Sequence, residues 1–159
     1  MSSELTIPFY RFGGKHRFVL VEDWKVDLQM GLRGYHELRD NDSLWAVLHD
    51  DLLTVMAGYA CDGCSPAWRV FGRWYGTPTP PGAIGPAIVH DVLRGYLGLP
   101  CLKYDRKFTD DVFYNLLKRS GFEWGDVYHG AVAGFWGNVY IKMTAARPSS
   151  AVCACHPQR

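Results

Sequence analysis

The sequence contains no run of about 18 apolar residues, and neither sign of charge predominates. Lys and Arg number 17 against 16 Asp and Glu, so the formal net charge is +1. The first absence argues against a transmembrane helix. The second leaves no strong electrostatic basis for binding nucleic acid or a charged membrane surface. The first residues also lack the basic and apolar regions of a signal peptide, so we expect a cytoplasmic protein.

Cysteine is scarce, with five residues in a chain of 159. An odd number without a signal peptide argues against a disulfide framework. Cys61 and Cys64 form a C-x-x-C pair that could share a zinc ion with Cys153, Cys155 and His156. This spacing matches no common zinc module. We therefore expect reduced thiols rather than a structural metal.

Three common catalytic and nucleotide-binding motifs are also missing. The chain has no G-x-S-x-G nucleophile elbow, no G-x-x-x-x-G-K phosphate loop and no G-x-G-x-x-G after a strand. Any chemistry must therefore come from residues outside these motifs.

The pattern of apolar residues changes near the middle of the chain. In the first ~65 residues, alternation and β-branched content predict strands. The candidates are Arg17–Val21, Trp24–Leu28, Leu44–Leu48 and Leu52–Met56. The last two flank His49-Asp50-Asp51, which is the layout of a β-hairpin.

Three helices are predicted after the proline-rich loop at 77–82, over about residues 85–96, 105–120 and 125–143. Pro86 would lie in the first turn of the first helix. Gly130, Gly134 and Gly137 recur along the third helix, which suggests a closely approaching backbone. We predict an α+β fold, with an antiparallel sheet from the N-terminal half packed against a three-helix layer. Residues 1–145 would form one domain, and residues 146–159 a C-terminal tail.

The dipeptide His90-Asp91 lies among aliphatic residues within Pro86–Leu93. A helix that is apolar nearly all round is buried. A buried imidazole is costly unless other groups satisfy it, so His90 needs a partner.

Asp110 is the predicted partner of His90. Asp110, Phe113 and Leu117 share one helical face, which carries the carboxylate toward the core. An antiparallel helix pair would then bring it to His90. A carboxylate that holds one imidazole nitrogen leaves the other basic, as in a general base that activates water. The same pair could equally be a structural clamp between two helices.

Asp91 lies about 100° around the helix from His90 and is available to a loop. The segment Asp62–Ser65 offers a second carboxylate, and the backbone carbonyls of Gly63 and Ser65 could contribute further oxygen ligands. Together these groups could hold a hard cation such as Ca²⁺.

A cluster of aromatic and arginine side chains follows this segment. Such a cluster can stack nucleic-acid bases, but more often it covers a core or forms a partner interface. The candidate interface residues are Trp68, Arg69, Arg73, Trp74 and Tyr75.

Four blocks in this order resemble a family of small tailed-phage proteins of unknown function that also occur in prophages. The resemblance covers about residues 17–140. The blocks are Asp62–Pro66, His90-Asp91, Arg106 with Asp110 and Phe113, and Tyr128 with Val132 and a late glycine.

More distantly, the same blocks resemble the bacterial and fungal secreted phospholipases A(2). Those enzymes carry D-G-C-S in a calcium loop, H-D on a helix and R-x-x-x-D-x-x-F on the next. The likeness implies that His90 is the base, Asp110 its orienting partner, and Asp91 with the loop from Asp62 the calcium site. This chain has Ala87 where those enzymes have a bonded cysteine.

We therefore expect a phage-type hydrolase that acts on an ester or phosphodiester in the host cytoplasm, with Ca²⁺ or no cofactor. Its substrate would be a small molecule or a lipid. One alternative is a non-catalytic tail, baseplate or assembly protein of the virion that binds other phage proteins. The second alternative is a module that sequesters a ligand without cleaving it.

Overall fold

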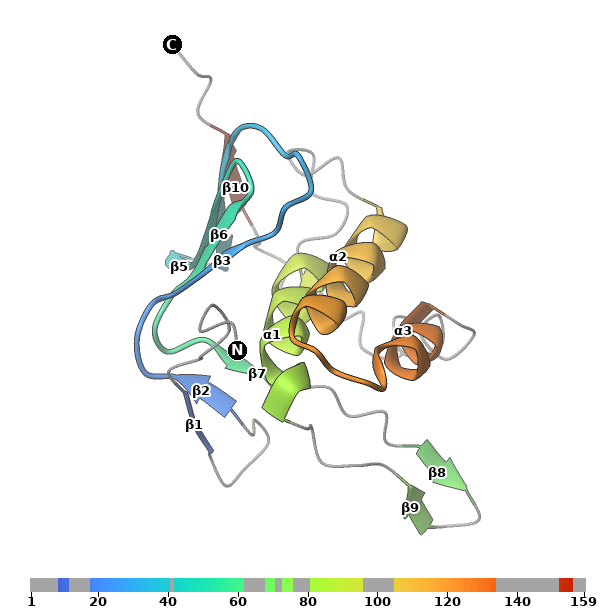
Figure 1. The fold of residues 1–159 in the computed structure, drawn as a ribbon. Helices are drawn as coiled ribbons and strands as arrows, with labels where there is room; N and C mark the ends of the chain where they lie inside the picture. The colour runs from blue at the N-terminus through green and yellow to red at the C-terminus, as the bar shows by residue number, and fades with distance from the viewer. Residues whose placement is uncertain are drawn as a thin grey trace.

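The computed structural model describes residues 9–11, 18–40, 42–61, 68–70, 73–75, 81–95, 105–133 and 152–155. Strands occupy the N-terminal half and three helices follow, which confirms the predicted α+β fold. Figure 1 shows the main sheet as one layer with the helices on one side of it. Within the described residues, no helix is both long enough and apolar enough to span a bilayer.

The main sheet has five antiparallel strands in the order β10-β4-β5-β6-β3. Its strands are β3 (Trp24–Asp27), β4 (Tyr35–Asp40), β5 (Ser43–His49), β6 (Leu52–Val55) and β10 (Val152–Cys155). The predicted hairpin around His49–Asp51 is confirmed, because β5 and β6 pair with Leu48 opposite Leu53. The strand predicted at Trp24–Leu28 is also present, as β3.

Two strands of this sheet were not predicted. β4 has the sequence Tyr-His-Glu-Leu-Arg-Asp, in which Leu38 is the one aliphatic residue, so its local pattern is too polar to indicate a strand. β10 lies within the predicted tail at 146–159 and pairs with β4. A pairing between residues so far apart in the sequence leaves no local signal in either segment.

A second sheet has the order β1-β2-β7, with β1 (Phe9–Arg11), β2 (Phe18–Leu20) and β7 (Ala60–Cys61). β8 (Trp68–Val70) and β9 (Arg73–Tyr75) form a separate hairpin, which Figure 1 shows beyond the ends of the helices. The backbone of this hairpin places Trp68 opposite Tyr75 and Arg69 opposite Trp74.

Helix α1 (Pro81–Gly95) begins earlier than predicted. Pro81 occupies its first position, where a missing N–H costs nothing, so Pro86 lies inside the helix and not in its first turn. Helix α2 (Arg106–Arg119) follows the prediction. Its N-cap Asp105 accepts a hydrogen bond from the Phe108 backbone N–H at 2.8 Å. Helix α3 spans Gly125–Ala133, and the remainder of the predicted third helix lies outside the described residues.

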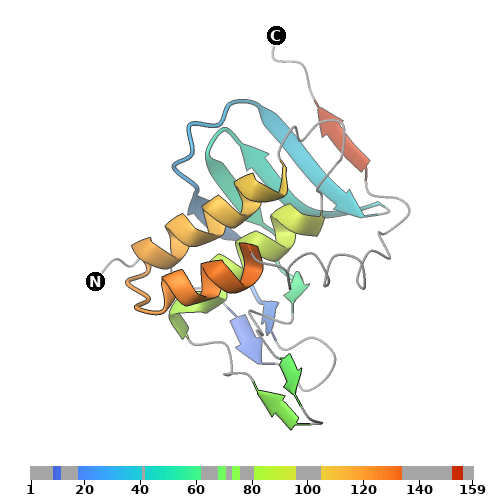
Figure 2. The same cartoon turned by 90° about the vertical axis from the view of Figure 1, so that its right-hand side faces the viewer.

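Helix α1 is buried on most of its circumference, as its composition predicted. Ile84, Ile88 and Val92 pack into a cluster with the strands, whereas Ala83 joins a second cluster with residues of α2 and α3. Figure 2 shows α1 and α2 running alongside each other across the face of the sheet. This central position of α1 is what buries its one imidazole.

The glycines of α3 do not all mark a close backbone approach. A Cβ added at Gly130 would meet no described atom within 4 Å, so the interpretation of the glycine stripe is wrong at this position. Gly134 and Gly137 lie outside the described residues. At Gly125 an added Cβ would lie 3.4 Å from the Cβ of Leu117, which is a contact with a side chain and not with a backbone.

The loop between β3 and β4 is folded around one carboxylate. Asp51 accepts hydrogen bonds from the backbone N–H groups of Met30, Gly31 and Leu32 at 2.9–3.0 Å. Gly31 has a φ of +72°, which places successive N–H groups on one side of the loop. Burial raises the pKa of Asp51, but the three N–H donors outweigh it and hold the pKa below its usual 3.8.

We expect Asp51→Ala to lower the free energy of unfolding by about 2 kcal/mol, because three N–H groups lose a charged acceptor. Urea denaturation measures this, with the exposed Asp42→Ala as the matched control. The pKa of Asp51 is lower in the folded state than in the unfolded state. Its stabilisation is therefore present above pH 3.8, the unfolded-state pKa, and is lost as the pH falls through the folded-state pKa. A difference between wild type and Asp51→Ala that does not shrink in acid would contradict this account.

Candidate functional site

The site lies where the C-terminal end of α1 meets the N-terminal end of α2. The two helices run antiparallel. Gly82 of α1 lies near Phe122, beyond the far end of α2, whereas Arg94 lies near Asp110 in the first turns of α2. The predicted antiparallel pairing is therefore confirmed.

This pairing brings His90 and Asp110 together, as the sequence predicted. Nε2 of His90 lies 2.9 Å from Oδ1 of Asp110. The two side chains are only 7% and 5% exposed, and the imidazole packs on the ring of Phe113 with 4.9 Å between centroids. Phe113 and Leu117 are fully buried on the face of α2 that carries Asp110.

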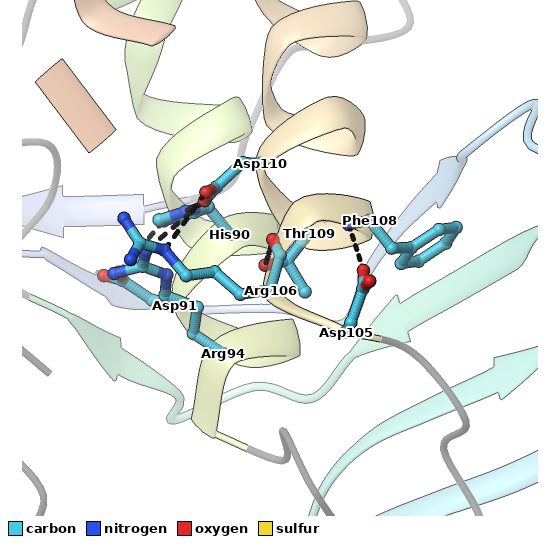
Figure 3. A network of polar contacts seen from close by, with 8 residues as sticks. All are labelled: His90, Asp91, Arg94, Asp105, Arg106, Phe108, Thr109 and Asp110. Carbon is cyan, nitrogen blue, oxygen red and sulfur yellow. Dashed lines mark hydrogen bonds and ion pairs between the residues drawn. The ribbon is translucent and has the colours of Figure 1, made fainter. Parts of the chain in front are cut away.

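Two arginines that sequence reasoning did not assign to the site also reach Asp110. Nη2 of Arg94 lies 3.3 Å from Oδ1, and Nε of Arg106 lies 3.4 Å from Oδ2. Figure 3 shows both guanidinium groups beside the dyad. A signal for them was present in the sequence, since Arg94 follows His90 by four residues and Arg106 precedes Asp110 by four.

The charge states of the dyad follow from its surroundings. Burial lowers the pKa of His90 below its usual 6.5. The hydrogen bond that His90 donates to Asp110 opposes this shift, and the charges of Arg94 and Arg106 reinforce it. For Asp110, burial raises the pKa, but His90 and the two arginines outweigh burial and bring it below 3.8. At neutral pH the imidazole is therefore neutral and the carboxylate is ionised.

These charge states determine where the imidazole carries its proton. An ionised carboxylate can only accept, so the proton lies on Nε2, which donates to Asp110. Nδ1 of His90 then keeps its lone pair. The described residues give Nδ1 no hydrogen-bond partner, and the carboxylate of Asp91, 40% exposed, lies 3.9 Å away. The basic nitrogen of His90 thus faces the side of the site that is closest to solvent.

The proposed calcium site is not assembled by the described residues. Asp62, Gly63 and Ser65 lie outside them, which leaves Asp91 as the one described candidate ligand. Its carboxylate interacts with the positive charge of Arg94. The described part of the chain contains no group of three His, Cys, Asp or Glu side chains that could hold a metal ion. Calcium binding stays a prediction.

The remaining sequence predictions concern thiols and the candidate interface. Cys61 is buried in β7, and Cys64, Cys101 and His156 lie outside the described residues. The backbone of β10 places Cys155 opposite His36 of β4. An interface role for Trp68, Arg69, Arg73, Trp74 and Tyr75 likewise stays a prediction.

No protein-family model matches the chain, and no curated protein or solved structure is detectably similar to it. The interpretation of the site therefore depends on its own geometry.

We expect Asp110→Ala to destabilise the fold by about 3–5 kcal/mol, because it leaves two partly buried guanidinium groups without their shared carboxylate. The neighbouring Asp111→Ala is the matched control. Asp111 is paired at 2.6 Å with Lys107, which is 80% exposed, so its loss costs less than about 1 kcal/mol. Chemical denaturation of both variants measures the difference. Equal losses would show that Asp110 is not the electrostatic centre of the helix pair.

Proposed function

We propose that this chain is a small phage-type hydrolase in which His90 acts as general base on an ester or phosphodiester, oriented by Asp110. The observation that carries the proposal is the state of His90. Its neutral imidazole is held through Nε2 by an ionised carboxylate, and the lone pair of Nδ1 lacks a described partner.

The reaction follows from this arrangement. A water molecule donates a hydrogen bond to Nδ1 of His90. As its oxygen attacks the carbonyl or phosphoryl centre, the imidazole takes the proton. The resulting imidazolium is stabilised by Asp110, which already accepts from Nε2. The proton is then delivered to the departing oxygen as the ester bond breaks, which returns His90 to its neutral form.

The two arginines tune this base. Burial is the largest cause that lowers the pKa of His90, and the positive charges of the two arginines lower it further, which keeps the imidazole neutral at neutral pH. The resemblance to secreted phospholipases A(2) assigns the same roles to His90 and Asp110, which supports the proposal independently of these charges.

We expect His90→Gln and Asp110→Asn to lower turnover at least about 100-fold, because each removes general-base catalysis. The assays are fatty-acid release from phospholipid vesicles and cleavage of bis(p-nitrophenyl) phosphate. The exposed His49→Gln on β5 is the matched control and should keep full activity. Circular dichroism verifies that the variants fold. Undiminished turnover in both dyad variants would contradict the proposal. A folded chain without turnover that is present at fixed stoichiometry in virions would favour the structural alternative.

The pH profile gives a separate test. Because the base must be unprotonated, kcat/KM should rise with pH through an apparent pKa below 6.5 and then stay level. Replacing Arg94 with Met should move the rising part of the kcat/KM profile to higher pH, because it removes a positive charge that opposes protonation of His90. An apparent pKa that is the same in wild type and in Arg94→Met would show that the titrating group is not beside Arg94.

A further inference from the structure

Strand β10 brings two cysteines to the edge of the main sheet, next to a histidine of β4. The two strands pair antiparallel and in regular register, with Cys153 opposite Leu38 and Cys155 opposite His36. The two cysteines are two residues apart, and side chains alternate between the faces of a strand. Directly opposed residues of an antiparallel pair share a face. Cys153, Cys155 and His36 therefore occupy positions on the same face of the sheet.

The spacing of these three positions fits a metal ion bound by thiolates. Residues i and i+2 of a strand are about 6.5–7 Å apart, and directly opposed Cβ atoms are about 4.5–5.5 Å apart. Two sulfurs bound to a tetrahedral zinc ion lie about 3.8 Å apart, because each Zn–S bond is about 2.3 Å long. The Cβ–Sγ bonds of two cysteines can span the difference. A cysteine pair with this spacing on a strand can therefore reach one ion.

The residue types at these positions are those that zinc prefers. Thiolate and imidazole are its usual protein ligands, and soft thiolates favour it over calcium or magnesium. His36 is described with its side chain and β10 by its backbone, so the strand register is the evidence that groups the three residues. The fourth position of a tetrahedral ion is left for water or for His156, which lies outside the described residues.

Apolar burial accounts poorly for the attachment of β10. The strand has four residues, lies at the edge of the sheet and pairs only with β4 among the described strands. On the face that carries the cysteines, its partners in β4 are Leu38, which is buried, and His36, which is half-buried. An ion bound to residues of both strands would hold β10 in register, because the free energy of metal binding adds to that of folding.

We propose that Cys153 and Cys155 of β10 and His36 of β4 bind one Zn²⁺, which fixes β10 to the edge of the main sheet. The sequence suggested thiols without a metal, because the third ligand comes from strand pairing and not from spacing along the chain. The cysteines bind as thiolates, so each releases its proton to solvent when the ion binds. The site shares no residue with His90 and Asp110, so it is independent of the proposed hydrolase.

Titration of the full, reduced chain with Zn²⁺ and with Co²⁺ tests this site, since bound Co²⁺ absorbs strongly in the near ultraviolet when its ligands are thiolates. We expect one ion per chain. Cys153→Ser, Cys155→Ser and His36→Gln should each weaken binding at least about tenfold. Cys64→Ser is the control for the cysteines and His49→Gln, at an exposed position of β5, for the histidine. Both controls should bind like wild type.

Two further measurements separate ligation from a merely structural role. His36→Cys replaces one zinc ligand with another and should keep the binding that His36→Gln loses. Zn²⁺ should slow amide hydrogen exchange in β10 and β4, and EDTA should reverse this effect. No binding by wild type, equal loss in Cys64→Ser, binding retained by His36→Gln or binding absent from His36→Cys would overturn the site. Zinc binding that leaves exchange in β10 unchanged would overturn its role in fixing the strand.

Discussion

The ionised carboxylate of Asp110 is the interaction on which the candidate site depends. It is 5% exposed, and a buried charge of this kind persists only if positive or hydrogen-bonding groups surround it. His90, Arg94 and Arg106 supply those groups from two helices. The contact with Asp110 holds the imidazole in one tautomer, whereas burial and the two arginine charges lower its pKa and keep it neutral. Stability and the proposed chemistry therefore share one carboxylate.

The sheet contributes to this arrangement indirectly. One face of β3, β5 and β6 buries apolar side chains against α1, which places that helix at the centre of the molecule. Because α1 is covered by strands on one side and by α2 on another, the side chain of His90 cannot turn fully into solvent. The loop folded around Asp51 connects β3 to β4 and closes the end of the sheet. The strands thus act as a rigid support for a site that the helices build.

Sequence reasoning was most successful where the signal was local. The spacing of Asp110, Phe113 and Leu117 predicted which face of α2 is buried, and the aliphatic surroundings of His90 predicted its burial. It failed for β4, whose residues are too polar to indicate a strand, and for β10, whose pairing with β4 is long-range. It also failed at Gly130, where an added Cβ would meet no atom of the described residues within 4 Å. Pro86 was misplaced because a proline at the true first position, Pro81, starts the helix earlier.

The sequence by itself determined the helices that carry the dyad, the faces they bury and the residue types available for general-base chemistry, because these follow from periodicity within one segment. Only the tertiary structure decided that Arg94 and Arg106 converge on Asp110, and that Nδ1 of His90 lies toward the exposed Asp91. The physical reason is that charge balance and tautomer depend on distances between helices. Those distances are set by how the sheet, α1 and α2 pack together, and no local pattern encodes them.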